Sequence, residues 1–131
     1  MIGIDSNVLV RYLVRDEPVQ TAIVDRFLET ELSERQPGYI SLVVLAETLW
    51  VLKRIYRLAP HDLAETVRDL LDIGRLQVEQ RSAVARALTR MGQRPGDWVD
   101  ALILEIAEAA GCERTVTFDR GAAKLGMTLL K

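Results

Sequence analysis

The chain has 131 residues and a mass of 14.7 kDa, a size that fits one compact domain. Hydrophobic residues make up 49% of it and charged residues 27%, which excludes a disordered, collagen-like or low-complexity chain. The net charge of −2 argues against a general nucleic-acid coat. No apolar run reaches the ~20 residues of a membrane span, no secretory signal follows Met1, and the lone Cys112 suits a reducing cytoplasm. We expect one soluble intracellular domain over residues 1–131.

Short apolar strands alternate with longer helical segments along the whole chain. In chain order the predicted elements are a strand at residues 1–5, helices at 7–15 and 18–32, a strand at 38–41, helices at 42–56 and 60–73, a strand at 76–79, helices at 81–91 and 97–110, a strand at 114–118, a helix at 120–125 and a strand at 127–130. Ser41 is placed to cap the helix that follows it. This alternation predicts an α/β fold, a three-layer α/β/α sandwich around a short central parallel sheet.

Acidic residues recur where the predicted strands end. Asp5 ends the first strand, and Asp119 follows the fourth. Glu47 lies within two turns of the start of the helix after the second strand, and Asp97 and Asp100 lie in the first turn of the helix that leads to the fourth. Open parallel sheets bind ligands outside the carboxyl ends of their strands. We therefore expect these carboxylates to converge on one edge of the sheet.

Each carboxylate also has a structural interpretation. Asp97 and Asp100 are spaced like a helix capping box, and Asp5 and Asp119 suit ordinary turns at strand ends. Glu47 fits such a role less well, because the helix around it is apolar on nearly all sides and has no Lys or Arg within one turn. A buried, unpaired carboxylate costs several kcal/mol, so we expect Glu47 to be neutralised, paired or bound to a metal.

Either an arginine or a divalent metal can neutralise such a cluster. A set of oxygen ligands without histidine or cysteine suits Mg²⁺ or Mn²⁺. His61, the single histidine, is expected on the surface in a structural role, and Cys112 is expected to be half-buried and inert. No glycine-rich phosphate loop occurs in the sequence.

Four segments in register resemble the PIN-domain family, and specifically its VapC-type toxin ribonucleases. They are residues 2–13 (IGIDSNVLVRYL), 45–48 (LAET), 96–103 (GDWVDALI) and 117–119 (TFD). Each segment alone is weak evidence for the family, but the four in order cover essentially the whole chain. The resemblance implies a Mg²⁺- or Mn²⁺-dependent endoribonuclease of the cytoplasm. It further implies a homodimer that a VapB-like antitoxin holds inactive.

The resemblance also assigns the site residues. The family's acidic quartet matches Asp5, Glu47, Asp100 and Asp119, and a further acidic position matches Asp97. Two positions depart mildly from the family pattern, since Ser6 stands where threonine is common and Trp98 where phenylalanine is frequent.

Roles within this site follow from the chemistry of phosphodiester cleavage, in which a bound metal ion activates water and neutralises phosphate oxygens. We expect Asp5, Glu47 and Asp100 to hold the principal ion, while Asp119 completes a weaker site or orients the water. Two further pairs have both a functional and a plain structural interpretation. Asn7 and Thr117 either position the carboxylates or serve a turn and a strand, and Arg94 and Arg120 either hold RNA phosphates or are merely solvated.

Three other functions are weighed against the ribonuclease. A catalytically silent PIN-fold module would have lost carboxylates, and this chain retains all of them. A phosphoacceptor receiver domain needs an aspartate at the end of the central strand and a lysine at the end of the last, which the third strand and Lys131 do not supply. A metal-dependent DNA nuclease stays open, because nothing in the sequence reads the 2′-hydroxyl.

Two assembly surfaces are also expected. The apolar helix at residues 42–52 is either a dimer interface or the buried centre of the fold. The tail of an antitoxin is expected to place an arginine or lysine among Asp5, Glu47 and Asp100, with its amphipathic part in a groove of the first helices near Tyr12 and Phe27.

Overall fold

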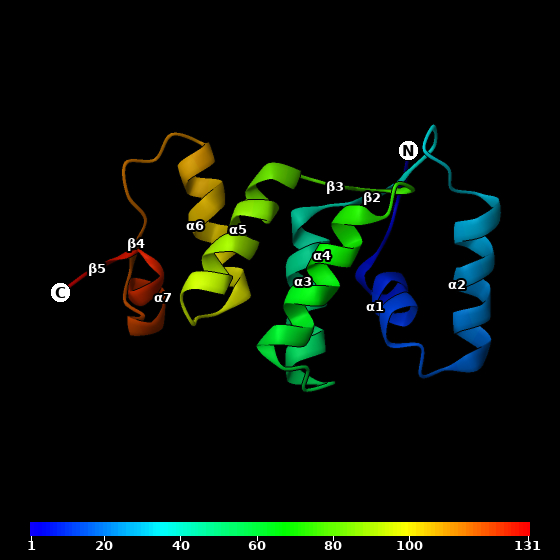
Figure 1. The fold of residues 1–131 in the computed structure, drawn as a ribbon, viewed down its shortest axis with the longest axis horizontal. Helices are drawn as coiled ribbons and strands as arrows, with labels where there is room; N and C mark the ends of the chain where they lie inside the picture. Colours follow the sequence, from blue (N-terminus) through cyan, green and yellow to red (C-terminus); the bar gives the residue numbers. More distant parts are fainter. The chain divides into compact units, whose positions relative to one another are not determined.

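A computed structural model describes residues 1–131, which form two compact units, Met1–Glu79 and Gln80–Lys131. Each unit has its own helices and its own short parallel sheet (Figure 1). The chain is therefore mixed α/β with seven helices, the class that the alternation of strands and helices predicts.

The first unit holds three strands and four helices. Its elements are β1 (Ile2–Gly3), α1 (Ser6–Val14), α2 (Pro18–Thr30), β2 (Gly38–Ile40), α3 (Leu42–Arg54), α4 (Pro60–Asp72) and β3 (Leu76–Val78). The strands pair in parallel in the order β1-β2-β3. Because all three run in the same direction, Asp5, Ser41 and Glu79 follow them at the same edge of the sheet.

The middle strand β2 is closely surrounded by apolar side chains. Ile40 is completely buried, and Gly38 lies opposite Leu76 in the sheet. A Cβ atom at Gly38 would lie 2.9 Å from Cδ1 of Leu32 and 3.1 Å from Cδ2 of Leu76. These separations are shorter than the contacts of carbon atoms in a packed core, so only glycine leaves room for both leucines.

Two side chains from the sheet edge hold the N-terminus of α3. Oγ of Ser41 accepts a hydrogen bond from the backbone N–H of Val44 at 3.2 Å, which confirms the predicted cap. Oε1 of Glu79 accepts from the backbone N–H of Leu42 at 2.8 Å. Burial, together with the neighbouring Glu79 carboxylate, raises the pKa of the Tyr39 hydroxyl. The start of α3 is thus fixed to the ends of β2 and β3.

The second unit holds three helices and two strands. Its elements are α5 (Arg81–Gln93), α6 (Trp98–Ala109), β4 (Val116–Thr117), α7 (Arg120–Leu125) and β5 (Thr128–Leu129). Helices α5 and α6 pack against each other, and β4 and β5 pair in parallel. Leu104, Ala122 and Met127 form a buried apolar cluster that joins α6 to α7 and the start of β5.

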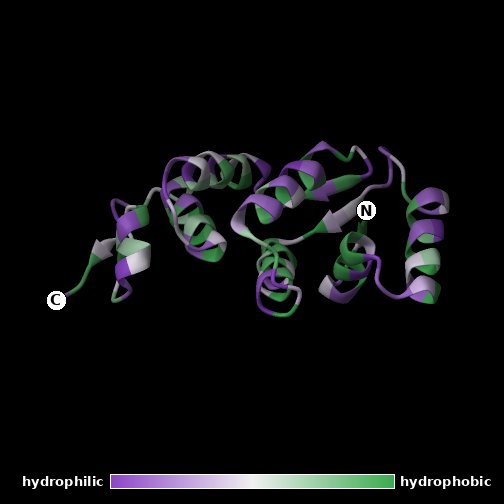
Figure 2. Ribbon diagram, turned by 60° about the horizontal axis from the view of Figure 1, so that its bottom comes forward, coloured by the Kyte–Doolittle hydropathy of each residue, from purple (hydrophilic) through white to green (hydrophobic).

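The predicted elements are all present, with differences of a few residues at their ends. The helix predicted at 42–56 ends at Arg54, and the helix predicted at 81–91 continues to Gln93. Figure 2 shows hydrophilic and hydrophobic residues mixed on the helices, and none of the helices has the length and apolar character to cross a membrane. A single domain over residues 1–131 stays a prediction.

Candidate functional site

Asp5 lies two residues beyond β1 and caps the first helix. Its Oδ1 accepts a hydrogen bond from the backbone N–H of Ser6 at 2.8 Å, and the residue has an extended backbone at the start of α1. The side chain of Asp5 is exposed. Capping therefore uses one oxygen of this carboxylate and leaves the group at the surface.

The hydroxyl of Ser6 connects Asp5 to Glu47. Ser6 is buried, with 7% of its surface exposed, and its Oγ donates a hydrogen bond to Oε1 of Glu47. The same Oγ lies 3.5 Å from Oδ1 of Asp5. A serine hydroxyl has one hydrogen to donate, and here Glu47 receives it. Two carboxylates that are 42 positions apart in the chain thus meet at one buried hydroxyl.

Glu47 is exposed, so the prediction that it is a buried carboxylate is wrong. Helix α3 buries one stripe of side chains at every third or fourth position: Leu45, Thr48, Leu49 and Leu52. At about 100° per residue, position 47 falls on the opposite side of the helix. It lies between Val43 and Trp50, which are 77% and 52% exposed. The apolar character of this helix therefore does not indicate burial of Glu47.

Asp97 caps α6 in the way that its spacing predicts. Its Oδ1 accepts hydrogen bonds from the backbone N–H groups of Val99 at 2.8 Å and of Asp100 at 3.2 Å. Asp100 lies in the first turn of the same helix, and both carboxylates are partly exposed. Trp98 between them is 4% exposed, which anchors the start of the helix in the core. The cap explains why these two aspartates lie side by side.

Asp119 caps the short helix α7. Its Oδ2 accepts from the backbone N–H of Ala122 at 2.7 Å, while its own backbone N–H donates to Oγ1 of Thr117 at 3.0 Å. Thr117 therefore contacts the main chain of Asp119, which fits the plain structural role weighed for it, and its positioning of a carboxylate stays a prediction. Asp119 is exposed, two residues after β4 ends.

The other predicted polar residues are all exposed. Asn7 is exposed and makes no hydrogen bond to Asp5 or Glu47. Arg94 is exposed, and its Nη1 donates to the backbone oxygen of Lys124 at 3.4 Å. Arg120 is exposed at the start of α7.

Each unit brings part of the predicted set together. The first holds Asp5 and Glu47 around Ser6, and the second holds Asp97 and Asp100 on one helical turn. Within neither unit do three or more His, Cys, Asp or Glu side chains form a group that could hold a metal ion on their own. Convergence of all five carboxylates on one edge stays a prediction.

A buried charged cluster in the second unit was not predicted. Glu105 on α6 is 3% exposed, and its Oε2 and Oε1 lie 3.0 Å from Nε of Arg86 and 2.9 Å from Nε of Arg90. The signal in the sequence was available, since an acidic residue interrupts an apolar helix beside a helix that has three arginines and no acid. The reasoning about burial that fails for Glu47 holds for Glu105.

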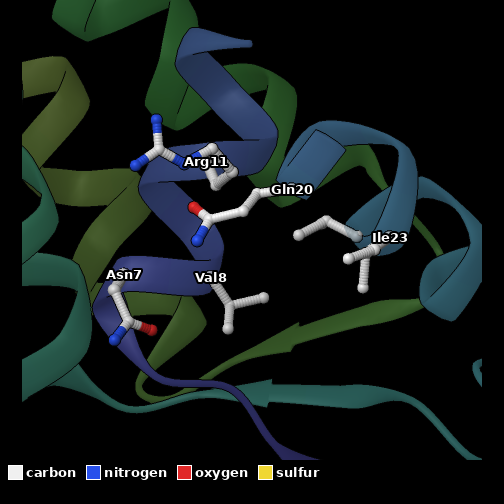
Figure 3. A pocket seen from close by; sticks show the side chains of 6 residues that line it. Asn7, Val8, Arg11, Gln20 and Ile23 are labelled. Atoms are coloured by element: carbon white, nitrogen blue, oxygen red, sulfur yellow. The ribbon is translucent and has the colours of Figure 1, made fainter. Parts of the chain in front are cut away.

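A pocket of about 470 Å³ lies between α1 and α2 (Figure 3). Residues from both helices line it: Asn7, Val8, Arg11, Gln20, Ile23 and Val24. Val8 and Ile23 supply apolar walls, and Arg11 lies at its edge in an ion pair with Asp16 at 2.6 Å. A pocket thus lies between the first two helices, but Tyr12 and Phe27, near which the groove was predicted, are half-buried and do not line it. Its use by an antitoxin stays a prediction.

His61 and Cys112, which were expected to have no role in the chemistry, both lie on the surface. The His61 side chain is 80% exposed, and its Nε2 lies 3.3 Å from Oε1 of Glu65 one turn along α4, as a structural surface role predicts. Cys112 is exposed, so the prediction that it is half-buried is wrong. It follows Gly111, whose positive φ of 90° ends α6 and turns the chain outward.

Comparison with known proteins gives a family match over nearly the whole chain. The model of the PIN domain matches residues 2–126, which spans both units. A VapC ribonuclease of Aquifex aeolicus is 28% identical over 125 residues, which cover 94% of this chain and 90% of that protein. The four segments that carry the family resemblance, from residue 2 to residue 119, fall within the match to the PIN domain. The chain belongs to the PIN domain family.

Proposed function

We propose that this protein is a metal-dependent endoribonuclease and the toxin of a VapBC-like toxin–antitoxin pair. The observation that carries the proposal is the group formed by Asp5, Ser6 and Glu47, where two carboxylates meet at a buried hydroxyl at the carboxyl end of a parallel strand. Membership of the PIN family and similarity to a VapC ribonuclease support it. Because the family match spans both units, we further propose that they form one PIN domain.

The donor set suits Mg²⁺, with Mn²⁺ as the alternative. The proposed ligands are all carboxylates: Asp5, Glu47, Asp97, Asp100 and Asp119. Hard divalent ions prefer oxygen ligands, and the only histidine and cysteine lie elsewhere on the surface. When bound, the ion lowers the pKa of a water molecule and neutralises phosphate charge.

The side chains have separate tasks in this proposal. Asp5, Glu47 and Asp100 hold the principal ion, and Asp119 orients the attacking water or completes a weaker site. Ser6 is a positioning residue, because its hydrogen bond fixes one oxygen of Glu47. Asp97 sets the start of α6 and thereby the direction of Asp100.

The test measures cleavage of total RNA with Mg²⁺ and with EDTA. Cleavage of a single-stranded DNA is measured under the same conditions. Cleavage of RNA that EDTA abolishes supports the proposal. Equal cleavage of DNA makes the protein a metal-dependent DNA nuclease, and binding of RNA without cleavage makes it a silent module.

Ser6 provides a prediction that is specific to this chain. Ser6→Ala is expected to reduce RNA cleavage about 10- to 100-fold and to raise the Mg²⁺ concentration that gives half-maximal rate, since Glu47 loses the hydroxyl that holds it. Ser6→Thr keeps the hydroxyl and should stay within a few-fold of the wild type. Ser82→Ala, at an exposed position of α5, is the matched control. Equal activity of Ser6→Ala and Ser6→Thr would remove this role.

The pocket between α1 and α2 is the proposed seat of the antitoxin's amphipathic tail, with its cation among Asp5, Glu47 and Asp100. Ile23 on α2 is 63% exposed at this pocket, and Ile55 after α3 is 62% exposed outside it. Ile23→Glu is expected to weaken the complex at least about tenfold, or 1.4 kcal/mol, because it places a charge against apolar surface. Ile55→Glu is the matched control. The affinity of each variant for the antitoxin is measured by titration calorimetry. Equal affinities of the two variants would exclude this pocket.

A homodimer is proposed from the family and from the exposed apolar side of α3. Val43 and Trp50 on this side are 77% and 52% exposed, and exposed apolar side chains of this kind can form an interface. Light scattering at micromolar concentration should give twice the chain mass for the wild type and the single mass for Trp50→Glu. A wild-type mass of one chain would exclude the dimer.

The proposed compartment is the cytoplasm, where the free Cys112 stays reduced.

A further inference from the structure

The charges of the chain are unevenly divided between its units. The first unit has nine Lys and Arg residues against thirteen Asp and Glu, while the second has eight against six. The second unit is therefore net positive in a protein that is net negative. Local charge of this kind decides where a polyanion is bound, and the overall charge does not.

Helix α5 carries three arginines and no acidic residue. Arg86 and Arg90 lie one helical turn apart, and Arg94 caps the C-terminus of the helix another turn further on. A shallow pocket of about 350 Å³ runs beside them. Its walls are Arg86, Thr89, Arg90, Gln93 and Arg94 from this side, with Glu105 and Glu108 from α6.

Arg90 is fully engaged by the protein. Its Nε lies 2.9 Å from Glu105, its Nη1 donates to the backbone oxygen of Leu125 at 2.7 Å, and its Nη2 lies 3.4 Å from Glu108. The Arg90 side chain is 22% exposed. Arg90 therefore ties α5 to α6 and to the end of α7, and each of its three guanidinium nitrogens already contacts a protein oxygen.

Arg86 and Arg94 keep donors for a ligand on either side of Arg90. Arg86 contacts Glu105 through Nε, and its side chain is 49% exposed, so its two terminal nitrogens keep their N–H groups for a ligand. Arg94 is exposed and makes one long contact, 3.4 Å from Nη1 to the backbone oxygen of Lys124. Thr89 and Gln93 are exposed between the two arginines. Gln93 adds an amide, and the Thr89 hydroxyl makes one long contact, 3.4 Å to the backbone oxygen of Ala85.

We infer that this arginine face, formed by Arg86, Thr89, Gln93 and Arg94, binds the phosphate backbone of the RNA substrate. Guanidinium groups bind phosphate through parallel N–H donors, and the two arginines are spaced about 12 Å apart along the helix, at 1.5 Å per residue. Donors repeated along a line suit a chain of phosphates better than a single anion. The inference rests on the proposed function, because it takes RNA as the substrate.

The test measures the binding of a fluorescein-labelled, 20-nucleotide single-stranded RNA by anisotropy, in EDTA, over a series of salt concentrations. Each phosphate contact that is lost lowers the slope of log K against log salt by about 0.7 for a single strand. Arg94→Ala should therefore lose about 0.7 of the slope, and Arg86→Ala with Arg94→Ala about 1.4. Arg86→Lys with Arg94→Lys keeps both positive charges and should keep most of the slope. Arg35→Ala with Arg68→Ala removes the same charge from exposed sites of the first unit and should leave the slope unchanged.

Several outcomes would overturn the inference. These are a wild-type protein that does not bind the RNA, an unchanged slope in Arg94→Ala, or an equal loss in the control pair. Arg94→Ala decides the matter even if loss of Arg86 disturbs Glu105, since Arg94 has no contact with that carboxylate. A wild type that cleaves RNA while all variants keep its slope contradicts this inference alone. Absence of metal-dependent RNA cleavage contradicts the proposed function instead.

Discussion

RNA cleavage in Mg²⁺ is expected to fall by roughly 10³ or more in each of three variants, Asp5→Asn, Glu47→Gln and Asp100→Asn. Each change keeps the size of the side chain and removes the negative charge that the proposed ion requires. Without metal the variants should be as stable as the wild type or more stable, because repulsion between neighbouring carboxylates is relieved. Rates on a defined RNA and melting temperatures with and without Mg²⁺ test both statements.

The capping geometry makes these substitutions interpretable. Asn at position 5 still offers an oxygen to the N–H of Ser6, so α1 keeps its cap. Asp69→Asn removes the same charge from an exposed position of α4 and should change neither the rate nor the response to Mg²⁺. If any of the three variants cleaved RNA at the wild-type rate, its carboxylate would have to be removed from the proposed site.

The two roles of Asp97, helix cap and proposed metal ligand, can be tested separately in the same experiment. Asn caps a helix as well as Asp does, so Asp97→Asn keeps the hydrogen bonds to Val99 and Asp100 while it removes the charge. A loss of cleavage at unchanged stability would then identify Asp97 as a metal ligand as well as a cap.

The order of elements and the local caps could be predicted because both depend on neighbours in the sequence. Alternation of apolar runs gives the strands and helices, and Ser41 and Asp97 stand directly before the helices that they cap. The register of the strands and the contacts between distant segments could not be predicted in this way. The hydrogen bond of Ser6 to Glu47 and that of Leu42 to Glu79 each join segments about 40 positions apart.

The two glutamates in apolar helices illustrate the limit of composition. Both Glu47 and Glu105 interrupt apolar runs, and composition alone predicts burial for either one. Angular position decides between them. Glu47 lies opposite the buried stripe of α3, while Glu105 lies within the stripe of α6 that includes Trp98, Ala101 and Leu102. A buried charge then needs partners, and the acid-free helix α5 supplies two arginines.

Glu105→Gln is expected to lower the free energy of unfolding of the second unit by about 3 kcal/mol. The substitution leaves Arg86 and Arg90 facing a neutral amide in a site where Glu105 is 3% exposed. Arg86 is half exposed and can recover water, but Arg90 is 22% exposed and stays held by the backbone oxygen of Leu125. Most of the loss therefore comes from Arg90.

Because Glu105 is buried, its substitution should cost more stability than the same substitution of Glu108, its exposed neighbour on α6. Glu108 also contacts Arg90, at 3.4 Å, but its side chain is 53% exposed, so Glu108→Gln should cost less than about 0.5 kcal/mol. Urea denaturation in a Trp50→Phe background follows the second unit through the fluorescence of Trp98, which is buried at the start of α6. Equal losses in the two variants would mean that Glu105 contributes no more than a surface ion pair, and packing of α5 on α6 would then have to rest on apolar contacts alone.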